Sequence, residues 1–579
     1  MISKELESAI SGYESYYKKH GGDLPLINAY YQAVFWAKEK DGDIEAALKI
    51  SPRVKEIMNE YVANLYAKNN KIGDLWRLEK ECFEVKQPHE VLDKWYQILK
   101  LEAQNKKLDS YLLYLEKNRI PRERFYAPKR KQFAKFGLID AYQGAIDDKY
   151  DIVCISMPPG TSKTTMLKFF NSAVIGWFPK DYNLFYSHSG DITRMYYDGV
   201  MQMVTDSQEY TWHEIFPDLQ VTSTNAKMQQ FNIGSYKPFP SLQTASVGSE
   251  NAGKVRASKF LLIDDMIGKL EEALNKNILE KLWGAYTVDA RQRKTMDFDG
   301  RPCKEVLQAT RWSTMDTIGR VIKMYQGNER VKVISIPDID PDTGESNFDY
   351  EYGGFTVAFF NDQALLMDDV SYKCLYKQQP IEREGLVFPE EKVRRYQNLP
   401  AEKPDEILGQ CDTKGKGTDY FVLPCLYRYG EDYYCVDCVC DNTADYELQY
   451  ENSANLIVHH QMNNCEYESN AGGDRVAMEV NKRVEEKGWI CNITTRPTET
   501  NKEARIFQCS NWILQHVIFK DKSLYTPKEQ YGVMMSLLLS YSVSAAKQLD
   551  DVPDVFSNFA LRMKRRSNQR KTIIMPSPI

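Results

Sequence analysis

Between residues 121 and 345, short apolar runs alternate with stretches of helical periodicity, and this alternation constrains the fold more than any other feature. Strands separated by helices are typical of a parallel sheet that is covered by helices. The sequence therefore predicts an α/β domain in this region. The apolar runs expected to form its strands are residues 151–157, 183–189, 259–264, 305–310 and 331–336.

The length of the chain predicts several domains, because 579 residues exceed the roughly 250–300 residues that one core supports. Near the N-terminus, Leu92, Trp95, Tyr96 and Leu99 have the spacing of one helical face. The expected divisions are a helical accessory domain (1–120), an α/β domain (121–345), a linker (346–404), a second α/β domain (405–560) and a flexible basic tail (561–579).

The second domain opens with three apolar stretches, at 406–413, 419–429 and 432–440, and a hairpin turn is expected at Gly430. A helix, a short strand that ends near Glu468, a second helix and a further strand are expected to follow. The resulting order, β-β-β-α-β-α, predicts a mixed sheet with helices packed against it.

A phosphate-binding loop is expected after the first apolar run of the α/β domain. Residues 158–165 read Pro-Pro-Gly-Thr-Ser-Lys-Thr-Thr and lead into a helix, a geometry in which backbone N–H groups surround a phosphate. Lys163 would reach the phosphates and Thr164 would hold Mg²⁺. The full motif has Gly where Met157 and Ser162 stand. The alternative interpretation is a βα turn with a capping threonine.

An acidic strand end supplies the second half of this site. The run 259–264 is followed directly by Asp265, so that Asp264 and Asp265 stand together at the end of a buried strand. Asp264 is the expected magnesium ligand and Asp265 occupies the position of the water-activating acid. Glu271 and Glu272 are the alternatives for the acid, and simple capping of the next helix is the structural alternative.

A second set of acids is spread through the later domain. Asp412 ends its first strand, Glu468 ends a short strand, and Asp551 and Asp554 begin the last helix. Carboxylates in these positions are what a two-Mg²⁺ nuclease of the RNase H type needs. Because any domain of this size contains separated acids, a purely structural role is the alternative.

Composition excludes some classes of protein. A net charge of −6 excludes a globally basic nucleic-acid coat but permits a local basic groove. The apolar stretch 533–546 is shorter than the roughly 18 residues of a membrane span, and no export signal is expected at the N-terminus. Cys435, Cys438 and Cys440 lie in a strand-like segment without a second ligand cluster, which favours buried thiols over a metal site.

Taken together, these motifs resemble the large terminase subunit of tailed bacteriophages or prophages, the motor that packages and cuts viral DNA. The resemblance covers about residues 120–565 and depends on the order of its segments. The segments are SMPPGTSKTT (156–165), LLIDD (261–265), TRW (310–312), LYKQQPIEREGLVFP (375–389), ESNAGG (468–473) and DDVPD (550–554).

The resemblance implies a P-loop ATPase domain at 121–345 and an RNase H-like nuclease domain at 405–560, with ATP and Mg²⁺ as cofactors and Mn²⁺ as an alternative nuclease ion. Thr310 and Arg311 would form the motif that couples hydrolysis to movement, and Asp419 would assist the nuclease. The implied nucleotide site comprises Gly160, Thr161, Ser162, Lys163, Thr164, Thr165, Asp264, Asp265, Thr310 and Arg311, and the nuclease site Asp412, Glu468 and Asp554, or Asp551 in its place.

Two departures from the family pattern affect the nucleotide site. Many relatives carry an arginine shortly before the loop lysine and a glycine directly before it, whereas this chain has Gly160-Thr161 and Ser162. The stabilising arginine would then come from Arg194, Arg256 or a neighbouring subunit. The aspartate at 265, where glutamate is usual, leaves the choice of general base open.

The working hypothesis is a viral DNA-packaging motor that hydrolyses ATP and cuts DNA with a metal-dependent endonuclease. The resemblance implies double-stranded DNA, a portal protein and a small terminase subunit as partners. It also implies a homo-oligomeric ring and a location in the bacterial host cytoplasm, transiently at the procapsid portal. The alternative is a DNA-binding P-loop ATPase or helicase whose second domain is only structural.

Overall fold

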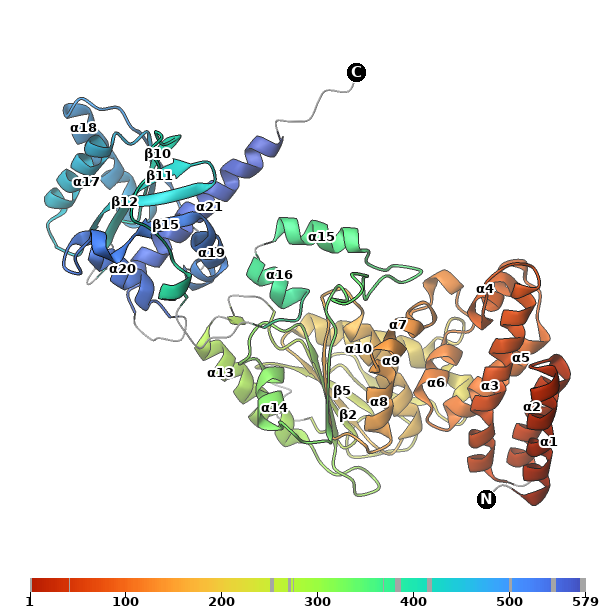
Figure 1. Ribbon diagram of the computed structural model, residues 1–579. Coiled ribbons are helices and arrows are strands. Elements are labelled where there is room, and N and C mark those ends of the chain that lie inside the picture. The colour runs from red at the N-terminus through yellow and green to blue at the C-terminus, as the bar shows by residue number, and fades with distance from the viewer. Residues whose placement is uncertain are drawn as a thin grey trace.

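A computed structural model shows two separate sheets, each in its own lobe, with the helices α15 and α16 near the junction (Figure 1). The N-terminal helices flank the first sheet, and the second sheet lies toward the C-terminus. The structure describes residues 3–40, 42–249, 255–268, 272–273, 275–367, 369–380, 387–413, 419–498, 502–542 and 548–572.

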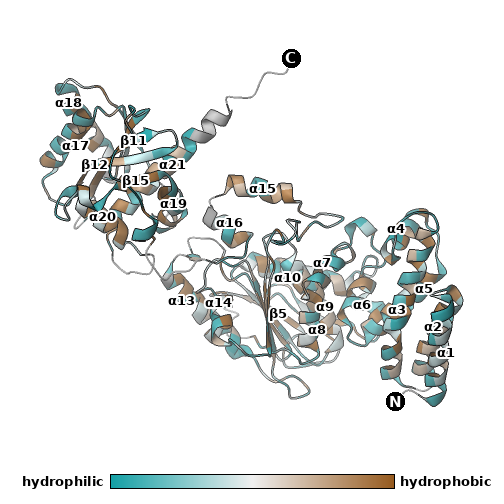
Figure 2. Cartoon of the chain, viewed as in Figure 1, coloured by the Kyte–Doolittle hydropathy of each residue, from teal (hydrophilic) through white to brown (hydrophobic). Residues whose placement is uncertain are grey.

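The N-terminal region is helical, as predicted. Hydrophilic and hydrophobic residues alternate along its helices (Figure 2). The first helix is capped by Ser3, whose side chain accepts a hydrogen bond from the Leu6 amide. The region shares one hydrophobic core with the next domain. The Trp177 indole also donates a hydrogen bond to the Ala103 carbonyl at 2.6 Å. The helices are α1 (Lys4–His20), α2 (Leu24–Glu39), α3 (Ile44–Ala67), α4 (Leu75–Val85), α5 (Glu90–Gln104) and α6 (Leu108–Leu115).

The first sheet has eight strands in the order β3-β4-β5-β2-β6-β7-β1-β8. The strands that correspond to the predicted runs are β1, β2, β6, β7 and β8, and they are parallel, as expected. The bounds are β1 (Ile152–Ser156), β2 (Asn183–Ser187), β3 (Val221–Asn225), β4 (Gln230–Ile233), β5 (Leu242–Ser246), β6 (Phe260–Asp264), β7 (Lys304–Ala309) and β8 (Val331–Ser335).

The sequence did not reveal β3, β4 and β5. Strand β3 is largely exposed and polar, and it pairs antiparallel with β4 at the edge of the sheet. Since an exposed edge strand needs no apolar run, hydrophobic patterning could not detect it.

Helices cover both faces of this sheet. Alternate strand residues, such as Val153 and Cys154, belong to separate core clusters on the two faces. One face packs against α7 (Arg130–Lys135), α8 (Leu138–Ile146), α9 (Lys163–Trp177), α10 (Gly190–Thr205) and α11 (Trp212–Ile215), and the other against α13 (Lys276–Gly284), the π-helical turn η4 (Ala285–Ala290) and α14 (Thr317–Met324).

The segment expected to be a linker contains structure of its own. It forms α15 (Val357–Leu366), α16 (Asp369–Leu375) and the short strand β9 (Arg394–Tyr396). Strand β9 pairs in parallel with β15 (Val517–Lys520), so the end of this segment belongs to the second sheet.

The second sheet has seven strands in the order β14-β13-β10-β11-β12-β15-β9. The predicted turn at Gly430 joins β11 to β12 with a left-handed φ of 61°, a conformation that glycine adopts without strain. The remaining bounds are β10 (Glu406–Cys411), β11 (Phe421–Tyr429), β12 (Asp432–Asp441), β13 (Asn464–Glu468) and β14 (Asn492–Arg496). One face carries α17 (Tyr446–His460) and α18 (Gly473–Glu486), and the other α19 (Lys502–His516), α20 (Gln530–Ser540) and α21 (Asp551–Thr572).

The prediction of a flexible tail from residue 561 is wrong for its first part. Helix α21 continues to Thr572, because its basic residues find partners on the sheet. Arg562 donates to the Gly409 carbonyl at 2.8 Å, and Arg566 forms two hydrogen bonds to the Glu406 carboxylate. Residues 573–579 lie outside the described part of the chain.

Two expectations from composition can be compared with the structure. Cys435, Cys438 and Cys440 are buried free thiols, and the described residues place none of them in a metal-binding group. Within the described ranges, no helix is both long and apolar enough to cross a membrane.

Candidate nucleotide and metal sites

The loop after β1 has the backbone of a phosphate-binding turn. Gly160 and Ser162 have left-handed φ angles of 77° and 81°, and α9 begins directly after Ser162. The left-handed conformation explains why the motif usually has glycine at this place, and here a serine adopts it. The Thr161 hydroxyl donates to the Pro158 carbonyl at 2.7 Å and fixes the loop from inside.

The side chain of Lys163 is buried at the mouth of this loop. Its ammonium donates to the carbonyls of Met157 and Pro158 at 2.9 and 3.0 Å and to the Thr310 hydroxyl at 3.2 Å. Thr310 follows β7, which lies between β1 and β6 in the sheet. The order of the strands therefore brings Thr310 between the loop and the acidic strand end.

Asp264 is the buried acid of the same site. Its carboxylate accepts hydrogen bonds from the Thr164 hydroxyl at 2.6 Å and from the Gln308 amide at 3.1 Å. Burial, with repulsion from Asp265, raises the pKa of Asp264 to about 7. A carboxylate with these neutral partners would gain from a bound cation, because a cation favours its charged form.

Asp265 has a different environment from its neighbour. Its backbone has a left-handed φ of 36°, and its carboxylate accepts the Thr310 amide at 2.9 Å. His188 forms a short hydrogen bond to the Asp265 carbonyl. A non-glycine residue held in this conformation is stabilised by its surroundings, and such positions concentrate at functional sites.

Several expected residues do not join this group. Arg311 is buried in an ion pair with Asp316 at 2.9 Å, where it supports the start of α14 rather than facing the loop. Glu272 accepts the Gly268 amide at 2.8 Å, and Glu271 lies outside the described residues. Arg256 donates to the Val255 carbonyl, and Arg194 is exposed on α10.

In the second lobe, three acids from distant parts of the sequence meet. Asp412 follows β10, Glu468 ends the neighbouring parallel strand β13, and Asp554 lies in the first turn of α21. One carboxylate oxygen of each lies within 4.8 Å of the others. Asp412 and Asp554 are buried and Glu468 is half-buried.

The structure distinguishes Asp554 from Asp551. The Asp551 carboxylate accepts the Tyr420 amide at 2.8 Å and contacts Lys502 at 3.2 Å, and it stands outside the group of three. Asp419 also stands outside that group. Of the two acids considered for the third position, Asp554 is therefore the one that faces Asp412 and Glu468.

Two cations from α19 lie against these acids. Arg505 is buried and contacts Asp554 at 2.6 Å. Lys502 lies 2.7 Å from Asp550, 3.2 Å from Asp551 and 3.6 Å from Asp554. The ammonium is also 3.9 Å from Asp412, so it is surrounded by carboxylates.

The pKa values follow from burial and these charges. Burial, followed by repulsion from Asp554, raises the pKa of Asp412 well above its ordinary value. Burial also raises the pKa of Asp554 to about 6, although Arg505 and Lys502 oppose the shift. Burial disfavours the charge of Lys502, but the surrounding carboxylates outweigh it and raise the pKa of Lys502 above its ordinary value.

Glu468 is oriented by two asparagines. Asn470 donates to one carboxylate oxygen at 2.8 Å, and Asn558 donates to the other at 3.2 Å. The sequence did not reveal either asparagine as a site residue, nor did it reveal Lys502 and Arg505. Arg505 did leave a signal, because it occupies the same helical face as the buried residues Cys509 and Ile513.

The three carboxylates fit a divalent cation. Mg²⁺ and Mn²⁺ prefer hard oxygen ligands, and Asp412, Glu468 and Asp554 offer three from separate elements. Raised pKa values at Asp412 and Asp554 indicate a place where positive charge is favourable.

Residues 411–518 match the family model described as the Ribonuclease H-like domain of the bacteriophage T7 terminase. This segment is therefore similar to the RNase H-like domains of terminases. The match includes Asp412, Glu468, Lys502 and Arg505 but ends before Asp554. It confirms the expected resemblance to terminase large subunits and the predicted RNase H-like class of this terminase domain.

Solved structures of terminases are also similar to this chain. The large terminase of a thermophilic bacteriophage has a TM-score of 0.32 at 10% identity, over 76% of this chain and 99% of that one. The bacteriophage HK97 large terminase has a TM-score of 0.30 at 9% identity, over 72% and 94%. The Mn-soaked human cytomegalovirus terminase nuclease domain has a TM-score of 0.24 at 10% identity, over 29% and 93%. No curated protein matches the sequence.

Proposed function

We propose that this chain is a viral DNA-packaging motor that hydrolyses ATP to translocate double-stranded DNA and cuts it with a metal-dependent endonuclease. The observation that carries the proposal is the convergence of Asp412, Glu468 and Asp554 within 4.8 Å in a chain that also has a phosphate-binding loop. The pKa values of Asp412 and Asp554 are raised even though Lys502 and Arg505 lie against these acids, so the group would gain from a further bound cation. This geometry therefore supports a nuclease over a structural second domain.

In the ATPase lobe, the chain's own groups suit a nucleoside triphosphate with Mg²⁺. The Lys163 ammonium would turn from its carbonyl partners to the β- and γ-phosphates, and the loop amides would surround them. Thr164 and Asp264 would hold the ion that accompanies the nucleotide. Asp265 would accept a proton from the attacking water, and its link to the Thr310 amide would transmit the change to β7.

In the nuclease lobe, Asp412, Glu468 and Asp554 would hold one or two divalent cations. When bound, such ions supply positive charge to a phosphodiester and lower the pKa of water. Asn470 and Asn558 keep Glu468 in position, and Arg505 does the same for Asp554. Because these groups read no base, we expect cleavage that tolerates many sequences.

The proposal also includes the proteins with which the motor would assemble. A portal protein, a small terminase subunit and a homo-oligomeric ring would place the motor transiently at a procapsid in the cytoplasm of the bacterial host. Translocation would act on backbone phosphates, so DNA binding should weaken steeply with salt. The stabilising arginine, whether Arg194, Arg256 or a residue of a neighbouring subunit, would be identified by its effect on ATP hydrolysis in the assembled ring.

The test separates the two activities. Lys163→Ala should lower ATP hydrolysis by more than about 100-fold and leave plasmid cleavage in Mn²⁺ intact. Asp412→Asn should abolish cleavage and leave ATP hydrolysis intact.

Matched controls are Lys323→Ala, on α14, and Asp405→Asn, which lies at the opposite end of the strand that carries Asp412. ATP hydrolysis by Lys163→Ala at the rate of the unchanged chain would refute the motor. Cleavage by Asp412→Asn at the rate of Asp405→Asn would refute the nuclease assignment.

A further inference from the structure

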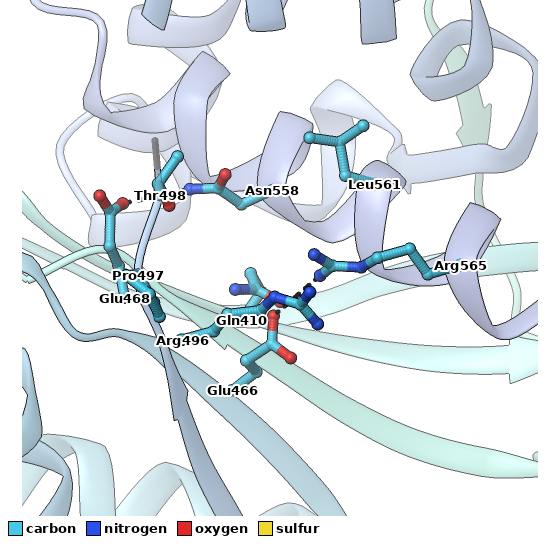
Figure 3. A pocket seen from close by; sticks show the side chains of 9 residues that line it. All are labelled: Gln410, Glu466, Glu468, Arg496, Pro497, Thr498, Asn558, Leu561 and Arg565. Atoms are coloured by element: carbon cyan, nitrogen blue, oxygen red, sulfur yellow. Dashed lines mark hydrogen bonds and ion pairs between the residues drawn. The ribbon is translucent and has the colours of Figure 1, made fainter. Parts of the chain in front are cut away.

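A cavity of about 300 Å³ opens beside the carboxylate cluster, between the ends of β13 and β14 and helix α21 (Figure 3). Its volume is roughly that of ten waters at about 30 Å³ each, enough for a phosphate group with its adjoining sugar. Glu468 lines this cavity and also belongs to the carboxylate cluster, so the two sites share a wall.

Helix α21 continues from the cluster along the cavity. Asp554, Asn558, Leu561 and Arg565 follow one another at intervals of four, three and four residues, which places them on one face of the helix. The last three line the cavity, and Asp554 is in the cluster. At about 1.5 Å per residue, Arg565 stands roughly 16 Å along the helix from Asp554.

Two arginines face this cavity. Arg496 lies on β14 in register with Glu468 on β13, and its guanidinium points into the cavity beside that of Arg565 (Figure 3). Within the described part of the chain, the Arg496 guanidinium has no hydrogen bond or ion pair. The Arg565 guanidinium forms an ion pair with the Glu466 carboxylate at an N–O distance of 3.6 Å. Burial, together with the charge of Arg496, lowers the pKa of the Arg565 guanidinium, so the two cations repel each other.

The charge balance of this cavity depends on the neighbouring metal site. Arg496 and Arg565 contribute two positive charges to its lining, and Glu466 and Glu468 contribute two negative charges. Glu466 is also 3.8 Å from Arg562, which compensates part of its charge. Once Glu468 holds a cation, its charge is offset and the two arginines outweigh Glu466. Guanidinium groups bind phosphate oxygens in a bidentate manner.

We propose that this cavity binds a backbone phosphate of the DNA strand being cut, next to the scissile phosphodiester, with Arg496 and Arg565 as its ligands. The proposal rests on the proposed nuclease function and adds the position of the substrate strand. Leu561 would contact the sugar, and Asn558 and Thr498 offer polar contacts at the end of the cavity nearest Glu468. Arg496 and Arg565 would thus position the strand relative to the cluster without ligating the metal.

The test measures cleavage of a short linear duplex by the full chain in Mn²⁺ without ATP, over a range of NaCl concentrations. Arg496→Ala and Arg565→Ala should each raise KM by about 10-fold, the effect of removing a charged hydrogen bond. The dependence of log kcat/KM on log salt should become shallower by about 0.9 for each DNA phosphate that the variant no longer binds. The Mn²⁺ concentration for half-maximal activity should stay unchanged, and Arg565→Lys should recover part of the loss.

Lys482→Ala is the control, because it removes one positive charge from the exposed face of α18. Equal KM and salt dependence in Arg496→Ala, Arg565→Ala and Lys482→Ala would overturn the phosphate site. A shifted Mn²⁺ requirement would also overturn it, because the arginines would then shape the metal cluster. If the unchanged chain does not cut DNA, the nuclease proposal fails and this one fails with it. If inorganic phosphate inhibits cleavage while both variants keep the KM of the control, the cavity binds a free anion and not the strand.

Discussion

Lys163 of the phosphate loop and Lys502 of the nuclease lobe are both cations beside buried acids, but they have different partners. Lys163 donates to two carbonyls and a hydroxyl, and the Asp264 carboxylate is bound by neutral groups. Lys502 and Arg505 instead lie directly against the carboxylates. The nuclease lobe thus has cations in direct contact with its acids, whereas the Asp264 carboxylate has neutral hydrogen-bond partners and Lys163 acts on it only through its charge.

The counter-charge comes from a helix that also contacts the rest of the molecule. Ala504, between Lys502 and Arg505 on α19, is buried in the same core cluster as Cys374 of α16. The cations of the nuclease lobe are therefore anchored partly by packing outside that lobe. In the nucleotide site the lysine is held within its own lobe, by two carbonyls of its loop and by the Thr310 hydroxyl after β7.

The largest expected effect tests the identity of the third nuclease ligand. Asp554→Asn should lower cleavage by more than about 100-fold, since even residues that only support metal ligands cost 10–100-fold. Asp551→Asn should cost about 10-fold or less, because this acid contacts Tyr420 and Lys502 outside the cluster. Initial rates of plasmid nicking in Mn²⁺ measure the effect of each substitution. An equal loss of cleavage rate in the two variants would show that the two acids act together.

The next effect concerns the built-in counter-charge. Lys502→Ala should strengthen the binding of the first Mn²⁺ ion by about 10-fold, because a bound cation no longer competes with the ammonium. Isothermal titration of the full chain measures the affinity. Lys522→Ala, an exposed lysine paired with Glu390, is the control. Weaker Mn²⁺ binding in Lys502→Ala would mean that the ammonium organises the ligands rather than competing with the ion.

A moderate effect is expected on stability. The folded-state pKa values of Asp412 and Asp554 are raised, so their contribution to stability is greatest at low pH and is lost as pH rises through the folded values, about 6 for Asp554. In metal-free buffer at pH 7.5, Asp412→Asn should therefore raise the Tm of the nuclease lobe by about 2–4 °C.

Calorimetry in EDTA over pH 4.5–8 checks this expectation, with Asp405→Asn as the control. The difference between Asp412→Asn and the unchanged chain should shrink toward low pH, where the aspartate is protonated. A difference that is independent of pH would show that packing, not charge, separates the two proteins.

The smallest effect is expected in the phosphate loop. Ser162 has a left-handed φ of 81°, so Ser162→Gly should relieve about 1 kcal/mol of backbone strain. We expect a slightly higher Tm for the ATPase lobe and less than a threefold change in ATP hydrolysis. Gly160→Ala, at a φ of 77° and with its Cβ 3.3 Å from Phe355, should have the opposite effect on Tm. A loss of stability in Ser162→Gly would show that the serine side chain contributes a contact.

Much of the fold could be predicted because its signals are local. The apolar runs at β1, β6 and β7 are buried on both sides, and the turn at Gly430 needs a single residue with positive φ. The exposed strand β3 has no such pattern, and β9 consists of three residues whose pairing with β15 is decided more than a hundred positions along the chain. The basic end of the chain was predicted to be a flexible tail because Glu406, the partner of Arg566, is also more than a hundred positions away in the sequence.

The sequence by itself determined the strand–loop–helix around Lys163, the adjacent acids at the end of β6 and the acid after β10, because each depends on backbone preferences within a few residues. Tertiary structure alone selected Asp554 over Asp551, brought Lys502 and Arg505 to the acids and formed the cavity between Arg496 and Arg565. These contacts join β10, β13, β14, α19 and α21, and the order of strands in the sheet decides which of them meet. The periodicity of apolar side chains indicates which face of a helix or strand is buried. It does not indicate which distant element covers that face.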